Sequence, residues 1–173
     1  AGAVMVEGTT EEGVGFVDSY NRTDGKGLPF LHIKAGGSVS PASQFTVDHR
    51  LHYTYQEGRT VFRYAVTAMG DDCATLLERN KMTTDDVDFV VCHQANLRII
   101  EAVAKRIGIP MEKVLVNIQR YGNTSAACMP LVLWDFESQL KKGDNIVFTA
   151  FGAGFVNGAS LFKWAYDLSL IHI

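Results

Sequence analysis

The stretch VDFVVCHQANLRII, residues 87–100, decides the fold class of this chain. Residues 87–91 are mostly apolar and rich in valine, which is typical of a short strand buried on both faces. Apolar side chains then recur at helical spacing over residues 96–107, until Gly108 and Pro110 end the helix. A buried strand that leads directly into an amphipathic helix predicts an α/β fold, in which helices cover the faces of a sheet.

The same alternation of strand and helix extends in both directions from this stretch. Residues 60–79 carry a single apolar stripe at helical spacing, and residues 146–150 form a second apolar run of strand length. Three clusters of turn-forming residues between positions 21 and 58 predict a long surface loop. We expect the remaining elements to be strands at 3–7, 14–20, 114–116 and 159–164 and a helix from about residue 122 to residue 140.

Length and composition exclude several classes of protein. The 173 residues suit one domain or a large part of one. The formal net charge of -3 lacks the basic excess of nucleic-acid-binding proteins. The apolar runs are shorter than the ~20 residues that a membrane-spanning helix needs. We therefore expect neither a nucleic-acid nor a membrane partner. The three cysteines are an odd number without disulfide-like spacing, which indicates a reducing, cytoplasmic location.

Candidate functional residues follow the predicted strands. In open α/β sheets, ligands bind beyond the carboxyl ends of the strands. The loops expected there contain His93, Asn123 and the segment 151–154. An imidazole and a carboxamide can both donate hydrogen bonds to one carbonyl oxygen, and so can hold an oxyanion or enolate. The backbone N–H groups of the Gly-Ala-Gly turn at 152–154 can serve a second oxyanion, since small residues admit a ligand closely.

Each of these features also has an ordinary structural interpretation. His93 can be a structural or merely solvated residue at the end of a strand. Asn123 can be the N-cap of the following helix, a common role for asparagine. Residues 152–154 can form only a tight turn. The shared location of the three loops, rather than any single residue, supports the functional hypothesis.

Three motifs in this chain match a known family. They are HQANLRII at residues 93–100, GNTSAA at 122–127 and AFGAGF at 150–155. In this order and spacing, residues 70–164 resemble the carboxyl-terminal half of β-ketoacyl-acyl carrier protein synthase III, and QEGRTVF at 56–62 extends the similarity. The resemblance implies a thiolase-like fold: the carboxyl-terminal half of a condensing enzyme, with a mixed sheet covered by helices.

The resemblance also implies a reaction of fatty acid biosynthesis. Such transferases use a Cys-His-Asn triad, in which the cysteine takes an acyl group from acyl-CoA. Malonyl-acyl carrier protein then loses carbon dioxide, and the carbanion attacks the acyl thioester to give a 3-oxoacyl-acyl carrier protein. By resemblance, His93 and Asn123 are the two donors that stabilise the thioester oxygen during decarboxylation. Neither a cofactor nor a metal is implied.

The resemblance assigns further roles and partners. The family's carrier-protein surface corresponds to Gln94, Ala95, Asn96, Leu97 and Arg98, and the pocket loop to Phe151, Gly152, Ala153 and Gly154. Because carrier proteins are acidic, Arg98 is expected to steer the encounter, although it can also be an ordinary solvated residue. Where this chain has FVNG at 155–158, the family commonly has a string like Phe-Thr-Trp-Gly. A homodimer is expected for the full-length enzyme.

The nucleophilic cysteine is expected in the amino-terminal half of the enzyme. Cys92 adjoins His93, but neighbouring side chains of an extended segment point to opposite faces, so the two should not meet. We expect Cys73, Cys92 and Cys128 to be buried packing thiols. The piece of chain studied here should therefore be inactive alone.

The domain organisation follows from the same resemblance. Residues 1–58 are expected to hold the end of the amino-terminal half with strands and the long loop, and residues 59–167 the carboxyl-terminal synthase domain. Residues 168–173 are expected to be a non-native tail, because this apolar hexapeptide is similar to the translation of a common sequencing adapter. Two other functions stay open: a different thiolase-fold starter synthase of polyketide type, and a noncatalytic module that docks carrier protein.

Overall fold

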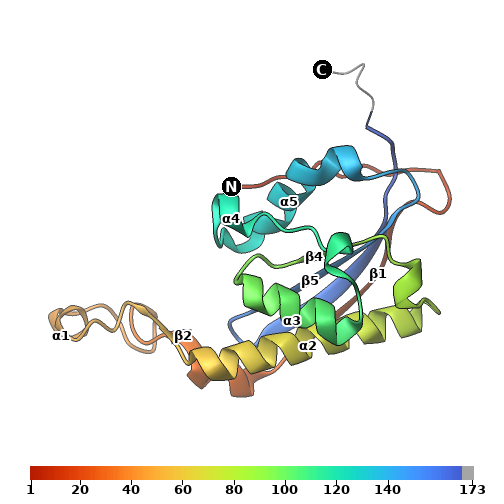
Figure 1. Cartoon of the computed structure of the whole chain (residues 1–173). Helices are drawn as coiled ribbons and strands as arrows, with labels where there is room; N and C mark the ends of the chain where they lie inside the picture. The colour runs from red at the N-terminus through yellow and green to blue at the C-terminus, as the bar shows by residue number, and fades with distance from the viewer. Residues whose placement is uncertain (169–173) are drawn as a thin grey trace.

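The stretch that begins at residue 87 forms strand β4, Phe89–Cys92, and then helix α3, Leu97–Ile107, as the sequence predicts. In this computed structural model, which describes residues 1–168, β4 is at one edge of a four-stranded sheet of order β1-β6-β5-β4 (Figure 1). β4 and β5 are parallel, whereas the other pairs are antiparallel. The expected α/β fold with a mixed sheet is thus confirmed. The remaining strands of this sheet are β1, Gly15–Thr23; β5, Asn145–Gly152; and β6, Val156–Lys163.

Helices lie on both faces of this sheet. Figure 1 shows α2, Gly58–Arg79, and α3 below the sheet and α5, Cys128–Phe136, above it. Side chains alternate between the two faces along each strand. In β4, Val90 and Cys92 therefore pack toward α2 and α3, whereas Val91 packs with residues of the α5 side. This alternation fixes the face on which His93, the next residue, must lie.

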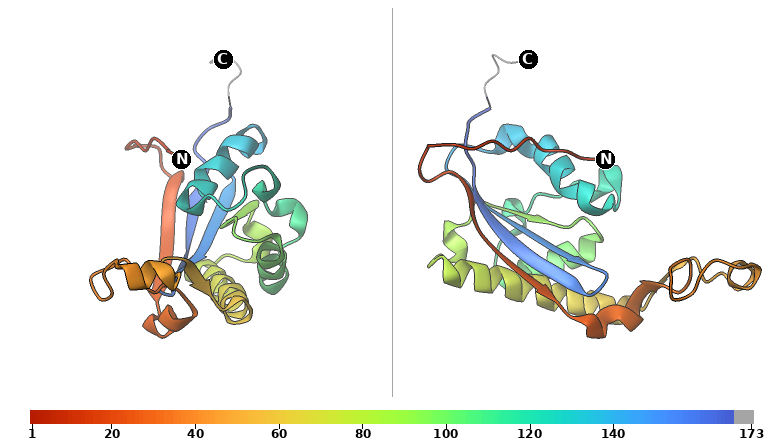
Figure 2. Two further views of the ribbon diagram at one scale, coloured as in Figure 1. Left: turned by 90° about the vertical axis from the view of Figure 1, so that its left-hand side faces the viewer. Right: turned by 180° about the vertical axis from the view of Figure 1, so that it is seen from behind.

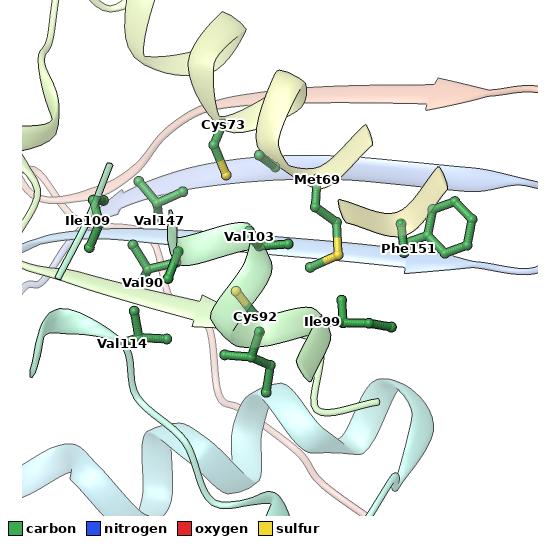
Figure 3. Packing of buried hydrophobic residues seen from close by; sticks show 14 of the residues in the cluster. Met69, Cys73, Val90, Cys92, Ile99, Val103, Ile109, Val114, Val147 and Phe151 are labelled. Carbon is green, nitrogen blue, oxygen red and sulfur yellow. The ribbon is translucent and has the colours of Figure 1, made fainter. Parts of the chain in front are cut away.

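The larger core fills the space between the sheet and the helix pair α2 and α3. Figure 3 shows Met69 and Cys73 of α2 and Val103 of α3 in one cluster with Val147 of β5. These side chains are almost fully buried. The expected helix at 60–79 is confirmed, because its apolar stripe is the face that packs here. A smaller cluster on the opposite face is formed by Val91, Leu115, Val132, Leu140 and Ile146.

Local signals set the ends of α3. The Asn96 side chain accepts a hydrogen bond from the Arg98 N–H, which satisfies a backbone donor in the first turn of the helix. Gly108 closes the helix with φ of 77°, a left-handed conformation that favours glycine. The start of α3 is therefore fixed directly after the loop that carries His93.

The expected continuous helix from 122 to 140 is wrong. Gly122 has φ of 65° and Ser125 has φ of 56°, and neither conformation fits a right-handed helix. Pro130 is tolerated because α5 begins only at Cys128, which puts the proline in the first turn. The segment consists instead of α4, Ile118–Tyr121, a 3₁₀ turn at Ser125–Ala127, α5, and a 3₁₀ turn at Glu137–Gln139.

Two expected strands are not formed in the structure. Residues 3–7 are irregular and exposed, with no strand partner within residues 1–168. Residues 114–116 make only an isolated parallel bridge between Val114 and Val90. The other expected strands are confirmed as β1, β5 and β6 with shifted ends. Further 3₁₀ turns lie at Thr84–Asp86 and Met111–Lys113.

The segment expected to be one long loop, residues 21–58, is more ordered than predicted. It begins with the end of β1 and a 3₁₀ turn at Gly25–Phe30, and continues as an arm that extends away from the sheet (Figure 2). Strands β2, Leu31–Ile33, and β3, Thr54–Gln56, pair to form the base of the arm, and the short helix α1, Gln44–Asp48, lies beyond them. The turn-forming residues at 36–38 do lie in bends, but residues 21–23 of the first predicted cluster belong to β1. The short strands of this segment left no clear periodic signal.

A buried carboxylate connects β1 and β6 to α2. Asp72 of α2 is fully buried, and Arg22 of β1 contacts its Oδ1 at 2.7 Å. The Nδ2 of Asn157 in β6 donates to Oδ2 of the same carboxylate. Nearer the other end of β1, Arg79 contacts Asp18 at 3.0 Å. Because a buried charge is costly unless paired, Asp72 fixes how these three elements meet.

None of the helices within residues 1–168 combines the length and apolar character needed to cross a membrane. Of the expected non-native tail, 168–173, Leu168 is partly exposed, and residues 169–173 lie outside the described part of the chain.

We predict that Gly27→Ala destabilises this fold by about 1–3 kcal/mol, as overpacking typically does. A Cβ at residue 27 would meet the ring of Phe155. That ring is 1% exposed and held by neighbouring rings, so it has no room to move. Gly25→Ala is the matched control, because a Cβ there meets nothing within 4 Å. Chemical denaturation of the full-length protein measures both variants, and equal stabilities would contradict the prediction.

Candidate active site

His93 follows the last residue of β4 and faces the α5 side of the sheet. Its backbone N–H donates to the Thr149 carbonyl oxygen at 2.8 Å, which continues the pairing of β4 with β5. Its side-chain Nδ1 lies 3.1 Å from Sγ of Cys128, the first residue of α5. The half-buried imidazole is desolvated, and this lowers the pKa of His93 below its ordinary value. Burial therefore favours the neutral form of the His93 imidazole.

His93 lines a cleft of about 440 Å³ on this face. The floor of the cleft is formed by β5 and β6, including Ala150, Gly152 and Gly158. Ser125 and Ala126, which follow Asn123 in the chain, form part of the rim. The structure thus brings His93, part of the 122–127 motif and the end of β5 to one cleft, although Asn123 itself is not among the residues that line it.

Asn123 lies beside this cleft and is exposed. Its Oδ1 accepts a hydrogen bond from the Ser125 N–H at 2.9 Å. The side chain therefore closes a local turn, and Thr124 rather than Asn123 is the N-cap of the turn that follows. The Asn123 Nδ2 donates to no group within residues 1–168, so its hydrogens are available to a ligand.

The segment 151–154 consists of the last two residues of β5 and the first two residues of the turn that leads into β6. The ring of Phe151 packs against Phe155, with 4.7 Å between centroids, and belongs to the core on the α2 and α3 side. Gly152 pairs with Val156 and lines the cleft. Ala153 and Gly154 are not among the cleft-lining residues. The structure therefore brings Phe151 and Gly152 to the cleft with His93, whereas Ala153 and Gly154 lie outside its lining.

Gln94 is a buried structural residue, and its expected place on a docking surface is wrong. Its side chain is 0% exposed. Its Oε1 accepts from the backbone N–H groups of Asn117 and Ile118, both at 3.1 Å. Its Nε2 donates to the Cys92 carbonyl at 2.8 Å. A polar side chain satisfied in this way is unavailable to a partner protein.

The next residues of the same motif do reach the surface. Asn96, Leu97 and Arg98 are exposed at the start of α3, whereas Ala95 is half-buried. Asn96 also caps the helix, so exposure alone does not define its role. The Arg98 guanidinium forms no ion pair within residues 1–168. A free positive charge therefore stands a few residues from His93.

The three cysteines occupy two different environments. Cys73 and Cys92 are buried between the sheet and the helix pair, as Figure 3 shows. Burial raises the pKa of Cys73 to about 12 and that of Cys92 further. Both are packing thiols, as expected, and Cys92 points away from His93. Cys128 is also buried, but its contact with His93 was not anticipated from the sequence.

A second set of residues that the sequence analysis missed holds the chain before Asn123. Asp135 of α5 is largely buried and accepts from Asn117 Nδ2 at 2.9 Å and from Arg120 at 2.7 Å. The Tyr121 hydroxyl donates to the same carboxylate at 3.1 Å. These bonds fix α4 against α5 and so fix where the loop at Gly122 begins. No sequence motif marks this arrangement, because its members are brought together only by the fold.

Within residues 1–168, no group of three or more His, Cys, Asp or Glu side chains is arranged to hold a metal ion.

Comparison with known proteins identifies the family. Residues 77–164 match the family described as 3-oxoacyl-[acyl-carrier-protein (ACP)] synthase III C terminal. The chain belongs to the β-ketoacyl-acyl carrier protein synthase III family. Beta-ketoacyl-[acyl-carrier-protein] synthase III of Phocaeicola vulgatus is 66% identical over 167 residues, which cover 96% of this chain and 50% of that protein. The chain thus spans about half the length of the curated relatives it matches.

Solved structures of synthase III enzymes share the fold. The 3-oxoacyl-(acyl carrier protein) synthase III of Pseudomonas aeruginosa superposes with a TM-score of 0.79 at 34% identity, covering 94% of this chain and 48% of that one. The priming β-ketosynthase of the R1128 polyketide pathway superposes with a TM-score of 0.74 at 28% identity, covering 92% and 47%. These superpositions confirm the thiolase-like fold, and the match to the family's carboxyl-terminal region confirms which half this chain is.

We predict that Gln94→Ala lowers the free energy of unfolding of the full-length synthase by about 2–4 kcal/mol, because two buried N–H groups lose their acceptor. Gln119→Ala is the matched control, since this exposed side chain makes only one long bond, of 3.5 Å to the Val116 carbonyl. Denaturant titration compares the two variants. If Gln94→Ala were as stable as Gln119→Ala, the buried amide would have no structural role.

Proposed function

We propose that the full-length protein condenses an acyl-CoA starter with malonyl-acyl carrier protein, with loss of carbon dioxide. The product is a 3-oxoacyl-acyl carrier protein, the first condensation product of fatty acid biosynthesis. The observation that carries this proposal is the His93 imidazole at the edge of the cleft, beside the loop of Asn123. Membership of the synthase III family supports it independently.

The chemistry follows from where charge develops. Decarboxylation of a malonyl thioester puts negative charge on the thioester oxygen as the carbon–carbon bond breaks. One preorganised donor at such an oxygen is worth about 3 kcal/mol, and His93 with Asn123 supplies two. A neutral imidazole suits this role because an imidazolium would surrender its proton to the carbanion.

The acyl-transfer half of the reaction needs a nucleophile. Cys73 and Cys92 are closed off in the core, with pKa values raised by burial, and the thiolate is the reactive form of cysteine. We therefore assign the nucleophile to the amino-terminal half of the enzyme, which the family requires and this chain does not span. On this proposal, the domain boundary falls near residue 58, where α2 begins.

The proposal includes a docking surface for carrier protein. Asn96, Leu97 and Arg98 are its exposed members, and the unpaired Arg98 guanidinium complements an acidic partner. Arg98 lies in the first turn of α3, a few residues after His93 in the chain. A homodimer and a reducing cytoplasmic location complete the proposal, and three free cysteines are consistent with that compartment.

A polyketide starter synthase is the second candidate function. The superposition on the R1128 priming β-ketosynthase favours it, since that protein shares the fold over nearly all of this chain. The two functions differ in starter acyl group and in the carrier protein that is served. Condensation assays with short acyl-CoA starters and with each type of carrier protein separate them. A chain that bound carrier protein but decarboxylated nothing would instead be a docking module.

We predict that His93→Ala and Asn123→Asp each slow malonyl decarboxylation in the full-length protein by about 10²–10³-fold, because each removes one donor. Asn123→Asp is the sharper variant, since a carboxylate still accepts from the Ser125 N–H but donates nothing. Acyl transfer from acyl-CoA to the nucleophilic cysteine should be largely retained. Release of labelled carbon dioxide and formation of the acyl-enzyme measure the two half-reactions. Equal loss of both would contradict the assigned roles.

We predict that Arg98→Glu slows association with acyl carrier protein by about tenfold at low ionic strength, and by less at high salt, because steering by charge is screened. Lys141→Glu makes the same change of charge at an exposed residue that precedes the opposite, amino end of β5. Stopped-flow measurements over a range of salt concentrations compare the two. Identical rates for both variants would remove Arg98 from the docking surface.

A further inference from the structure

We propose that the Cys128 thiol is a positioning residue, which donates its hydrogen to Nδ1 of His93 and so holds the proton of the imidazole on Nε2. The 3.1 Å separation of Sγ and Nδ1 is the observation that carries this inference. It rests on the proposed function, because it explains how His93 becomes a donor rather than an acceptor in the cleft.

The groups around the sulfur determine the direction of this hydrogen bond. The Gln94 backbone N–H donates to Sγ at 3.4 Å. The sulfur therefore already acts as a hydrogen-bond acceptor. Nδ1 of His93 is the one acceptor recorded for the thiol hydrogen within residues 1–168. The thiol therefore donates and Nδ1 accepts.

Burial keeps both partners uncharged. Cys128 is 2% exposed, and desolvation raises the pKa of its thiol and lowers the pKa of His93. A thiolate–imidazolium pair would place two charges in a site where each is penalised. Apart from His93, none of the residues within 1–168 that line the cleft has a titratable side chain.

This hydrogen bond determines the role of Nε2, the other ring nitrogen of His93. A neutral imidazole carries one proton, so an acceptor role for Nδ1 requires a donor role for Nε2. Nε2 donates to no group within residues 1–168, and the ring lines the cleft. Its N–H is thus left for a thioester oxygen. Without the thiol, the two tautomers would compete, and the one with the proton on Nδ1 offers the cleft only a lone pair.

The experiment compares Cys128→Ala with Cys128→Ser in the full-length enzyme. Serine retains a hydroxyl donor in place of the thiol, whereas alanine removes the donor. Cys73→Ala is the control, because it deletes an equally buried sulfur from the other core without touching His93. ¹⁵N NMR of labelled imidazole distinguishes a protonated from an unprotonated ring nitrogen, and a pH titration of the same signals gives the His93 midpoint.

Three results are expected. In the parent protein and Cys128→Ser, Nε2 carries the proton, whereas Cys128→Ala shows a mixture of tautomers. The His93 midpoint rises in Cys128→Ala, since a bond donated to Nδ1 stabilises the neutral ring. The kcat of malonyl decarboxylation falls about 10- to 100-fold in Cys128→Ala with KM little changed, as when other groups that orient a histidine are lost. Cys128→Ser restores most of the rate.

A proton on Nδ1 in the parent protein would overturn the proposal. The proposal would also be overturned if the His93 tautomer and titration midpoint were the same in Cys128→Ala as in Cys73→Ala. The Cys128 thiol would then contribute only packing. These NMR measurements do not require the enzyme to be active. If the parent protein failed to decarboxylate malonyl-acyl carrier protein, the proposed function would be lost, but the tautomer measurements would still decide the role of Cys128.

Discussion

The buried carboxamide of Gln94 is the interaction on which the arrangement of the cleft depends. Its Oε1 accepts from the backbone N–H groups of Asn117 and Ile118. Its Nε2 donates to the carbonyls of Cys92, at the carboxyl end of β4, and Leu115. The segment 117–121 is in turn fixed to α5 by Asp135. The loop of Asn123 thus stands in a defined place relative to His93, although thirty residues of chain separate them. A buried amide with every group satisfied specifies one geometry, because any shift leaves a polar atom unpaired.

A second constraint is the alternation of side chains along β4. Two adjacent residues, Cys92 and His93, face opposite sides of the sheet, one into a closed core and the other toward the cleft. Although Cys92 and His93 are neighbours in the sequence, they therefore cannot act as a catalytic pair. The thiol that does meet His93 comes from α5, on the same face and 35 residues along the chain.

Features with a local physical cause were predictable from the sequence. Helices at 60–79 and 96–107 have a continuous apolar stripe, and Asn96 and Gly108 mark the ends of the second. The meeting of His93 with the 122–126 loop followed from the rule that loops at strand ends converge. Features that depend on distant partners were not predictable. Glutamine is a residue type usually found on the surface. Only the tertiary fold reveals the backbone groups with which Gln94 forms hydrogen bonds. The helix expected at 122–140 is interrupted near Ser125, which has a positive φ. Serine, unlike glycine, does not indicate such a conformation in the sequence.

The way in which β1 is held has a consequence for how the sheet comes apart. Many of its side chains are exposed, and it is joined to α2 by the ion pairs Arg22–Asp72 and Arg79–Asp18 rather than by a large apolar contact. The second of these pairs is partly solvated and therefore weakened by added electrolyte. Opening of the sheet should begin with fraying of this outer strand, while β4 and β5, clamped between two cores, remain together until global unfolding.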